Sequence, residues 1–249
     1  MTLGPSDREP TDDLPVPPPE LMEYGESPDK HVSSGRSDVR KMLAAVDACG
    51  FDWRQCETIL EFGCGNGRML RALSDKAATR TAWGADIQSD KVMWAMENLN
   101  PPLNFAVTTT VPHLPFPDRH FDLIFAGSVF THIGELHVAW LLELARLLAP
   151  SGFLYITVHD EHAVELGVDR GLPHIAEQMK KSSFATSLRS GEVDFVSLMP
   201  YGRGMLSQVK MSSAYVKRLT APFLRLVDTF PGAYGNLQTG YVLVTATSG

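Results

Sequence analysis

The feature that most constrains this chain is a run of glycines at alternate positions, Gly63, Gly65 and Gly67. Residues 58–62, just before it, are mostly apolar or β-branched, and good helix formers follow from Met69. A strand, a tight turn and a helix in this order bring backbone N–H groups and a helix N-terminus against a ligand. Glycines at the turn permit positive φ and let the ligand lie directly on the backbone. The sequence therefore predicts an α/β fold with a ligand-binding turn after its first strand.

The spacing of these glycines separates two kinds of nucleotide-binding turn. Dinucleotide folds use G-x-G-x-x-G, in which the last glycine allows a helix and a strand to pack closely. That position holds Arg68 in this chain, and a bulky cation fits it poorly. The string E-F-G-C-G-N-G, from Glu61 to Gly67, instead resembles motif I of the class I S-adenosylmethionine-dependent methyltransferases. A glycine-rich loop of some other α/β protein is the alternative interpretation.

The resemblance extends over about residues 37–247 and implies the fold of that family. This is an α/β fold with a Rossmann-like, seven-stranded, mostly parallel sheet, an antiparallel last strand and an inserted cap. We expect a flexible, Pro-rich N-terminal arm over residues 1–30, because such a segment buries little apolar surface. The methyltransferase domain is then residues 31–249, with residues 160–211 as an inserted cap or substrate lid, since long insertions in compact domains are usually functional or disordered.

Hydrophobic patterning and turn residues predict where the individual elements lie. Parallel strands that end at one edge of a sheet bring the residues after them together, and ligands of open α/β sheets bind there. Strands are expected at about 58–62, 80–86, 103–107, 123–127, 153–158, 223–230 and 239–245, helices at 37–50, 89–98, 135–148, 175–181 and 212–219, and a cap hairpin at 193–199 and 205–210.

The residues after the first four strands supply the expected cofactor site. Asp86 follows the glycine turn by ~20 residues, the spacing at which nucleotide folds carry a ribose-binding acid. A carboxylate there accepts two hydrogen bonds from a ribose diol, although a helix cap is the alternative role. Ile87 is expected to cover an adenine face. The cofactor-binding set that the resemblance implies is Glu61, Gly63, Cys64, Gly65, Gly67, Asp86, Ile87, Thr110, Val111, Ser128 and Val129.

Methyl transfer from a sulfonium is an in-line displacement, so alignment of the two substrates supplies much of the rate. An oxygen acceptor of high pKa also gains from a general base, most often His, typically worth ~10²–10⁴-fold. His132 and His159 follow the fourth and fifth strands and are the catalytic candidates, with packed or solvated histidines as the alternative. The candidate acceptor contacts are His132, His159, His162 and Gln238.

A metal site is a second interpretation of residues 159–162, H-D-E-H, because imidazole and carboxylate suit divalent cations. Adjacent residues of one loop seldom all face inward, so we expect no metal. The F-T-H-I string at 130–133 and the segment before the last strand look similar to bacterial methyltransferases of sugars, glycans or secondary metabolites. The prediction is therefore transfer to a hydroxyl of a small molecule. The alternatives are an N-methyltransferase of a small amine and a non-catalytic S-adenosylmethionine-binding scaffold or regulator.

Composition bounds the partners and the compartment. A net charge of −7 over 249 residues offers no electrostatic footprint for a phosphate backbone, which argues against nucleic acid. Three cysteines without a C-x-x-C spacing, and no secretory or membrane-spanning pattern, indicate reduced thiols and a cytoplasmic protein. The partner is then a small-molecule acceptor, with no membrane. The apolar hairpin of the cap could also pair two copies as a homodimer, although substrate enclosure explains it equally well.

Overall fold

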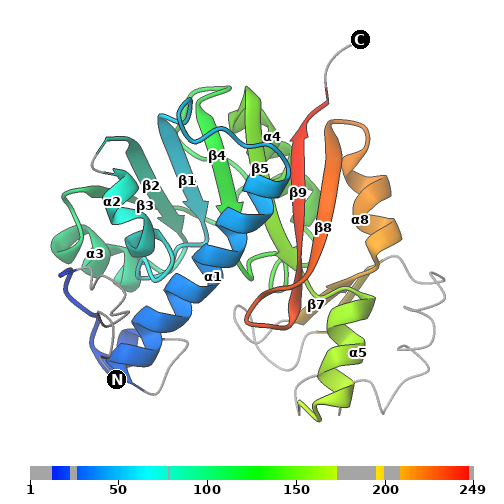
Figure 1. The fold of residues 1–249 in the computed structure, drawn as a ribbon, viewed down its shortest axis with the longest axis horizontal. Coiled ribbons are helices and arrows are strands. Elements are labelled where there is room, and N and C mark those ends of the chain that lie inside the picture. Colours follow the sequence, from blue (N-terminus) through cyan, green and yellow to red (C-terminus); the bar gives the residue numbers. More distant parts are fainter. Residues whose placement is uncertain (1–12, 23–26, 78, 173–194, 199–207, 247–249) are drawn as a thin grey trace, which may run out of the picture.

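The computed structural model describes residues 13–22, 27–77, 79–172, 195–198 and 208–246. Its framework is one seven-stranded sheet (Figure 1). The strands are β1 (Thr58–Phe62), β2 (Thr81–Asp86), β3 (Leu103–Val107), β4 (Phe121–Ala126), β5 (Leu148–Val158), β8 (Leu224–Tyr234) and β9 (Gln238–Thr245). They lie in the order β3-β2-β1-β4-β5-β9-β8.

Helices and short turns connect these strands. They are η1 (Pro19–Leu21), α1 (Pro28–Ala48), η2 (Leu70–Leu73), α2 (Ser74–Ala77), α3 (Ser89–Asn98), α4 (His137–Leu147), α5 (Glu161–Asp169) and α8 (Ser213–Thr220). A separate antiparallel pair is formed by β6 (Phe195–Leu198) and β7 (Gln208–Met211). Among the described residues, no helix is both long enough and apolar enough to cross a bilayer.

The pairing directions bring the site-forming ends of the strands to one edge of the sheet. β1 runs parallel to its two neighbours, β2 and β4. Further out, β2 pairs in parallel with β3, and β4 pairs in parallel with β5. β9 is antiparallel to both of its neighbours, with Thr239 opposite Val158. The first residue of β9 therefore lies at the edge where the parallel strands end. This arrangement confirms the predicted mostly parallel sheet with an antiparallel last strand.

Apolar residues fill both faces of the sheet. One core packs α1, η2 and α3 against it, with Met42, Leu70 and Val92 fully buried. The other packs α4, α8 and β7 against the opposite face. The longest helix, α1, starts where Ser27 accepts a hydrogen bond from the Lys30 backbone N–H and Pro28 follows it, which is a typical helix start. The helix begins at Pro28, earlier than the expected residue 37.

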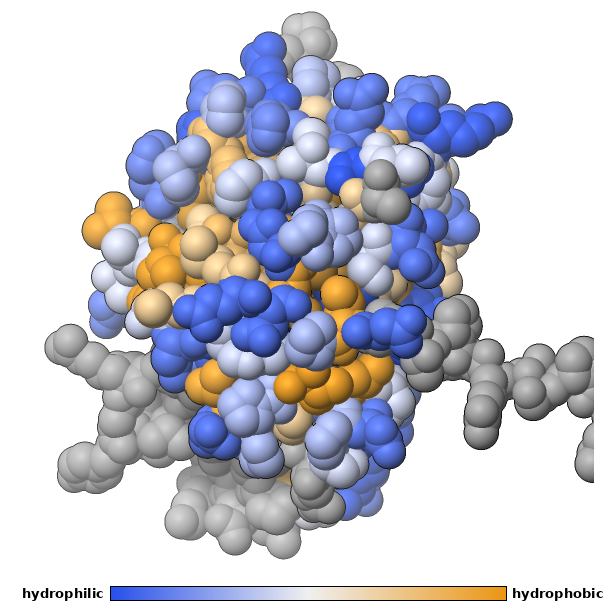
Figure 2. All heavy atoms as spheres, turned by 90° about the vertical axis from the view of Figure 1, so that its left-hand side faces the viewer, coloured by the Kyte–Doolittle hydropathy of each residue, from blue (hydrophilic) through white to orange (hydrophobic). Residues whose placement is uncertain are grey.

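The edge of the sheet at β3 is exposed. Figure 2 faces this side and shows apolar side chains gathered between hydrophilic ones. The large exposed apolar residues of this region include Met93 and Met96 of α3 and Val107 of β3. They belong to an outer helix and an edge strand, and exposed apolar side chains are common on the surfaces of folded proteins.

Several expected boundaries shift, for local reasons. After the glycine turn the chain makes a 3₁₀ turn before the four-residue helix α2. β5 extends back to Leu148, because Phe121 pairs with it before the register of β4 shifts. The helix α5 begins where the Asp160 side chain accepts from the Ala163 N–H at 3.1 Å. The expected helix at 175–181 lies outside the described residues, as do residues 1–12 and 23–26 of the arm and much of the cap.

Candidate functional site

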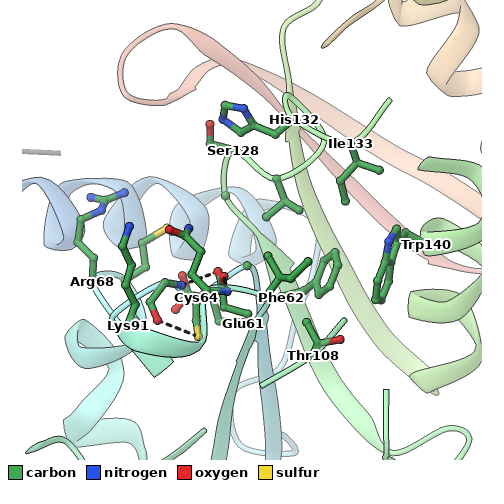
Figure 3. A pocket seen from close by; sticks show the side chains of 18 of the residues that line it. Glu61, Phe62, Cys64, Arg68, Lys91, Thr108, Ser128, His132, Ile133 and Trp140 are labelled. Atoms are coloured by element: carbon green, nitrogen blue, oxygen red, sulfur yellow. Dashed lines mark hydrogen bonds between the residues drawn. The ribbon is translucent and has the colours of Figure 1, made fainter. Parts of the chain in front are cut away.

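A cavity of about 1010 Å³ lies beyond the carboxyl ends of β1, β2, β3 and β4. Small-molecule sites typically have volumes of ~300–1,000 Å³, so the cavity is large enough for more than a single nucleoside. Figure 3 shows its two sides: Glu61, Cys64 and Lys91 lie at one, and Ser128, His132, Ile133 and Trp140 at the other. The predicted site residues that line it are Glu61, Gly63, Cys64, Gly65, Asp86, Ile87, Thr110, Ser128, Val129 and His132.

The glycine turn has the backbone conformation that its sequence predicted. Gly63, Gly65 and Gly67 all have positive φ, of 80°, 52° and 81°. A Cβ on Gly63 would lie 2.1 Å from the Val129 side chain, so any larger residue there would collide with the opposite wall. A Cβ on Gly67 would instead meet Leu99 and Phe105, which are core residues. Gly67 therefore shapes the turn from behind and does not line the cavity.

Asp86 ties two loops of the cavity together. One carboxylate oxygen accepts from the Gly65 N–H at 2.7 Å, and the other accepts from the Gln88 N–H at 2.8 Å. The residue thus supports the turn before α3 as well as the glycine turn. A carboxylate oxygen can accept more than one hydrogen bond, so the two backbone contacts do not by themselves exclude ligand hydroxyls.

Glu61 is the most unusual acid of the cavity. Its side chain is buried, and its Oε2 has no hydrogen-bond partner among the described residues. Burial raises the pKa of Glu61 well above its usual range, and nearby Arg68 offsets this only in part. Arg68 is itself held by Asp38 at 2.9 Å and by the Tyr234 hydroxyl at 2.8 Å. A cationic ligand group placed beside Glu61 would stabilise its ionised form.

Cys64 lies next to this acid and is also buried. Burial raises the pKa of the Cys64 thiol well above its ordinary value, and the nearby carboxyls of Glu61 and Asp86 raise it further. The thiol is therefore neutral and contributes shape and polarisability to the turn, not nucleophilic reactivity.

The loop after β3 contributes threonines. Thr108 is buried, and its hydroxyl has no hydrogen-bond partner among the described residues, so it offers a polar group to a ligand. Thr110 also lines the cavity. Val111 was expected beside it, but its side chain is 64% exposed and is not part of the lining. Thr108 was not among the expected cofactor contacts, although its position directly after a strand was a usable signal.

The loop after β4 forms the opposite wall. Ser128 has a φ of 61°, which is uncommon for a residue with a side chain. Val129, His132 and Ile133 then line the cavity, together with Trp140 of α4. Trp140 packs on Phe62 at the end of β1, with ring centroids 4.6 Å apart. The aromatic pair closes this end of the cavity with an apolar surface.

A histidine and a tyrosine fix the start of α4 behind this wall. The His137 ring contacts the Gly134 carbonyl oxygen through Nδ1 and the Tyr215 hydroxyl through Nε2, the latter at 2.6 Å. Burial lowers the pKa of His137. The neutral ring therefore joins the wall to α8, an element about eighty residues later in the chain.

Three predicted acceptor contacts lie outside the cavity lining. His159 is buried, its backbone carbonyl accepts from the Met211 N–H at 3.0 Å, and it pairs with Lys210 in an isolated bridge. His162 is exposed on α5. Gln238 is buried behind Ser128, to which it donates a hydrogen bond. The structure brings His132 into the cavity and leaves these residues around it.

The carboxylates beside these histidines have structural partners. Asp160 accepts from the hydroxyls of Thr239 and Tyr241 at 2.8 and 3.0 Å, and Glu161 accepts from the Ser213 N–H at 2.8 Å. Within the described ranges, no group of three His, Cys, Asp or Glu side chains is disposed to hold a metal ion.

Part of the N-terminal segment lies on the glycine turn. The Asn66 side chain donates to the Leu21 carbonyl at 2.7 Å. The buried Arg71 donates to the carbonyls of Leu14 and Pro15 at 2.6 and 2.9 Å. These contacts bring residues from the expected arm within reach of the cavity, which is also lined by His31 of α1.

The strand order, the antiparallel β9 and the glycine turn define the class I methyltransferase fold. A solved structure of this kind is the magnesium protoporphyrin IX methyltransferase of Synechocystis with bound S-adenosylhomocysteine. It superposes with a TM-score of 0.56, at 15% identity, over 90% of this chain and 90% of that one. Likeness at this identity concerns the fold.

Residues 60–156 match the family model described as a methyltransferase domain. The chain thus carries a class I S-adenosylmethionine-dependent methyltransferase domain, and S-adenosylmethionine is the cofactor of that class. Both findings confirm the resemblance seen in the glycine motif. A fit to this cofactor is also visible in the cavity, because the partnerless oxygen of Glu61 suits a cationic amino-acid tail and sulfonium.

Two curated relatives are O-methyltransferases. A fatty-acid O-methyltransferase of Mycolicibacterium smegmatis is 30% identical over 99 residues, which is 40% of this chain and 36% of that protein. A malonyl-[acyl-carrier protein] O-methyltransferase of a Marinomonas species is 22% identical over 175 residues, or 65% of this chain and 62% of that protein. The chain therefore aligns with about a third of the first relative and less than two thirds of the second.

Proposed function

We propose that this protein transfers the methyl group of S-adenosylmethionine to an oxygen atom of a small molecule by in-line displacement. The observation that carries the proposal is that one cavity is lined both by the glycine turn with its two acids and by the wall that contains His132. A donor at the first side and an acceptor at the second would lie within a single cavity. Proximity of this kind supplies much of the rate for a reaction with a good leaving group.

In this proposal the glycine-turn side holds the donor. Asp86 accepts the ribose hydroxyls while it keeps its backbone contacts, and Glu61 faces the cationic end of the cofactor. Gly63 and Gly65 let the ligand approach the backbone, and Ile87, Thr108 and Thr110 contact the base. The cofactor supplies the methyl group, and the protein supplies orientation and charge.

His132 is the proposed general base. Its imidazole would take the proton of an acceptor hydroxyl as the oxygen attacks the methyl carbon, a role that His fills most often. His159, His162 and Gln238 remain predictions as acceptor contacts. We also propose that residues 160–211 form a cap over the acceptor. Two described elements of this segment, α5 and β7, lie at the edge of the sheet where the parallel strands end (Figure 1).

The acceptor class has two candidates. The first is a hydroxyl of a sugar, glycan or secondary metabolite, as the sequence resemblance suggests. The second is an oxygen of an acid with an acyl chain, since the relatives' names are those of a fatty-acid and a malonyl-[acyl-carrier protein] O-methyltransferase. The apolar wall of Phe62, Val129, Ile133 and Trp140 suits the hydrocarbon chain of this second candidate. Its carboxylate needs no base, so the proposed base role of His132 applies to the first candidate.

The first test is calorimetry of the purified protein with S-adenosylhomocysteine and, separately, with NAD. Binding of the first alone is expected, whereas binding of NAD alone would contradict the cofactor assignment. The second test incubates the protein with methyl-labelled donor and matched sets of hydroxylated metabolites, fatty acids and amines. Labelled oxygen products support the proposal, and a labelled amine alone would replace it with N-methylation.

A further inference from the structure

Ser128 occupies a demanding position in the wall of the cavity. It follows the end of β4, and its positive φ turns the chain so that Val129 and His132 face inward. Residues other than Gly hold such a conformation only where their surroundings determine it. The contacts that hold Ser128 therefore fix the start of the loop that carries His132, whose N–H donates to the Val129 carbonyl at 2.9 Å.

Those contacts form a closed ring of buried hydrogen bonds. The Ser128 N–H donates to the Thr157 hydroxyl oxygen at 2.7 Å. The Thr157 hydroxyl donates to the Gln238 amide oxygen, and the Gln238 amide nitrogen donates to the Ser128 hydroxyl oxygen, each at 2.7 Å. All three residues are buried, with exposures of 8%, 0% and 6%.

A fourth residue, Thr131, supplies the acceptor for the remaining hydroxyl proton of the ring, that of Ser128. The Ser128 hydroxyl lies 3.0 Å from the Thr131 hydroxyl, which itself donates to the Ser128 carbonyl at 2.7 Å. With Ser128 as donor to Thr131, every hydroxyl proton in the group has one acceptor. Buried hydrogen-bond networks in which the hydroxyl protons are all accepted favour one arrangement of the chain.

The ring links two residues outside the cavity to the cavity wall. Thr157 belongs to β5, and Gln238 begins β9, which is inserted antiparallel beside β5. Neither side chain lines the cavity, whereas Ser128 does. From this arrangement we propose that Thr157 and Gln238 are positioning residues for methyl transfer, which act through Ser128 to aim His132. The inference rests on the proposed function, in which His132 meets the acceptor.

The test uses Thr157→Val, which removes the hydroxyl and keeps the shape, and Thr157→Ser, which restores it. The matched control is Thr220→Val, since Thr220 is equally buried and donates to the Val216 carbonyl within α8, away from the cavity. Gln238→Met is the second variant, should Thr157→Val fail to fold. For each variant we measure affinity for S-adenosylhomocysteine, the ring signals of His132 by ¹H–¹³C NMR, and kcat and KM with the acceptor found by screening.

The expected result separates positioning from packing. Thr157→Val and Gln238→Met should lower kcat by about 10- to 100-fold, because small misplacements of reacting groups have costs of this size. They should also shift the His132 signals and leave cofactor affinity within about threefold. Thr157→Ser should restore both readouts, and Thr220→Val should alter neither.

Loss of thermal stability with unchanged His132 signals and unchanged kcat would overturn the inference and leave a merely structural ring. The NMR readout requires no acceptor, so it decides the inference even if no product is found. Failure of the wild-type protein to bind S-adenosylhomocysteine would count against the proposed function instead.

Discussion

The two sides of the cavity are built from different parts of the chain. The backbone of the glycine turn is held by Asp86, which contacts Gly65 only 21 residues away, although Arg68 beside it also contacts the remote Tyr234. The β4-loop side, residues 128–136, depends on remote partners, since Gln238 lies 110 residues from Ser128 and Tyr215 lies 78 residues from His137. A turn that carries its own support can be recognised in a short motif. The other wall depends on the completed sheet, so no short motif identifies it.

The comparison predicts that a substitution on one side of the cavity changes the function of that side alone, either cofactor binding or turnover of the acceptor. The largest effect is expected for a substitution of His132. His132→Gln is expected to lower kcat for a hydroxyl acceptor by ~10²–10⁴-fold, the usual contribution of a general base. Affinity for S-adenosylhomocysteine should stay within about threefold, because the glycine-turn side is intact. Steady-state kinetics and calorimetry measure the two quantities.

His113→Asn is the control for that substitution, since the His113 side chain is 69% exposed and lies outside the cavity lining. Unchanged kcat in His132→Gln would indicate an acceptor that needs no base, such as a carboxylate.

Asp86→Asn should produce the converse result. It removes a charge-assisted acceptor from two loops and from the proposed ribose contact, and hydrogen bonds to charged groups contribute ~1.5–3 kcal/mol each. We expect a loss of about 30- to 300-fold in cofactor affinity, measured by calorimetry. The ring signals of His132 should be unaffected.

Asp122→Asn provides a matched control. Asp122 accepts from the backbone N–H groups of Glu57 and Thr58 at 2.8 and 3.0 Å, at the opposite edge of the sheet. Asp122→Asn should lower the free energy of unfolding about as much as Asp86→Asn does, and it should leave cofactor affinity unchanged. Equal losses of affinity in both variants would mean that Asp86 acts only through the fold.

Glu61 should make cofactor binding depend on pH. Burial raises the pKa of Glu61 in the free protein, and a cationic ligand favours its ionised form, so binding releases a proton. Affinity for S-adenosylmethionine should rise with pH, by at most about tenfold per pH unit, until the pH exceeds that pKa. Calorimetry between pH 5 and 8 tests this, and Glu61→Gln should flatten the profile.

The same acid should affect the stability of the free protein. The pKa of Glu61 is higher in the folded protein than in the unfolded chain. Its contribution to the free energy of unfolding is therefore fully present below the unfolded pKa, and it is lost as the pH rises through the folded pKa. Glu61→Gln removes this loss, so its melting temperature should exceed that of the wild type by about 2–4 °C at pH 8, and not at pH 4. A lower melting temperature at both pH values would exclude this account.

The smallest effect is expected at the contact between the N-terminal segment and the glycine turn. Arg71→Leu deletes the hydrogen bonds to the Leu14 and Pro15 carbonyls, which lie beside the turn without forming it. Cofactor affinity should fall by about two- to fivefold, consistent with the loss of about one net hydrogen bond. Limited proteolysis should show faster cleavage before residue 22, whereas Arg54→Leu, at an exposed surface pair, should change neither.

The difference between the two sides also explains what the sequence could reveal. Glycines at φ > 0 and a carboxylate at a strand end have few alternative uses, so the turn, Asp86 and the sheet order could be predicted. The places of Gln238 and Val111 depended on strand insertion and on the course of a loop, which no local pattern encodes. Burial of Glu61 without a partner for one oxygen likewise follows only from the tertiary packing.

The 110 residues between Ser128 and Gln238 also bear on how the molecule assembles. Contacts between distant segments form slowly, because the entropy of closing a long loop must be overcome before they stabilise anything. The glycine turn can therefore acquire native structure while β9 is still unpaired. Such an intermediate would recognise the nucleoside before it could align an acceptor, so the cofactor itself is in a position to assist the final steps of folding.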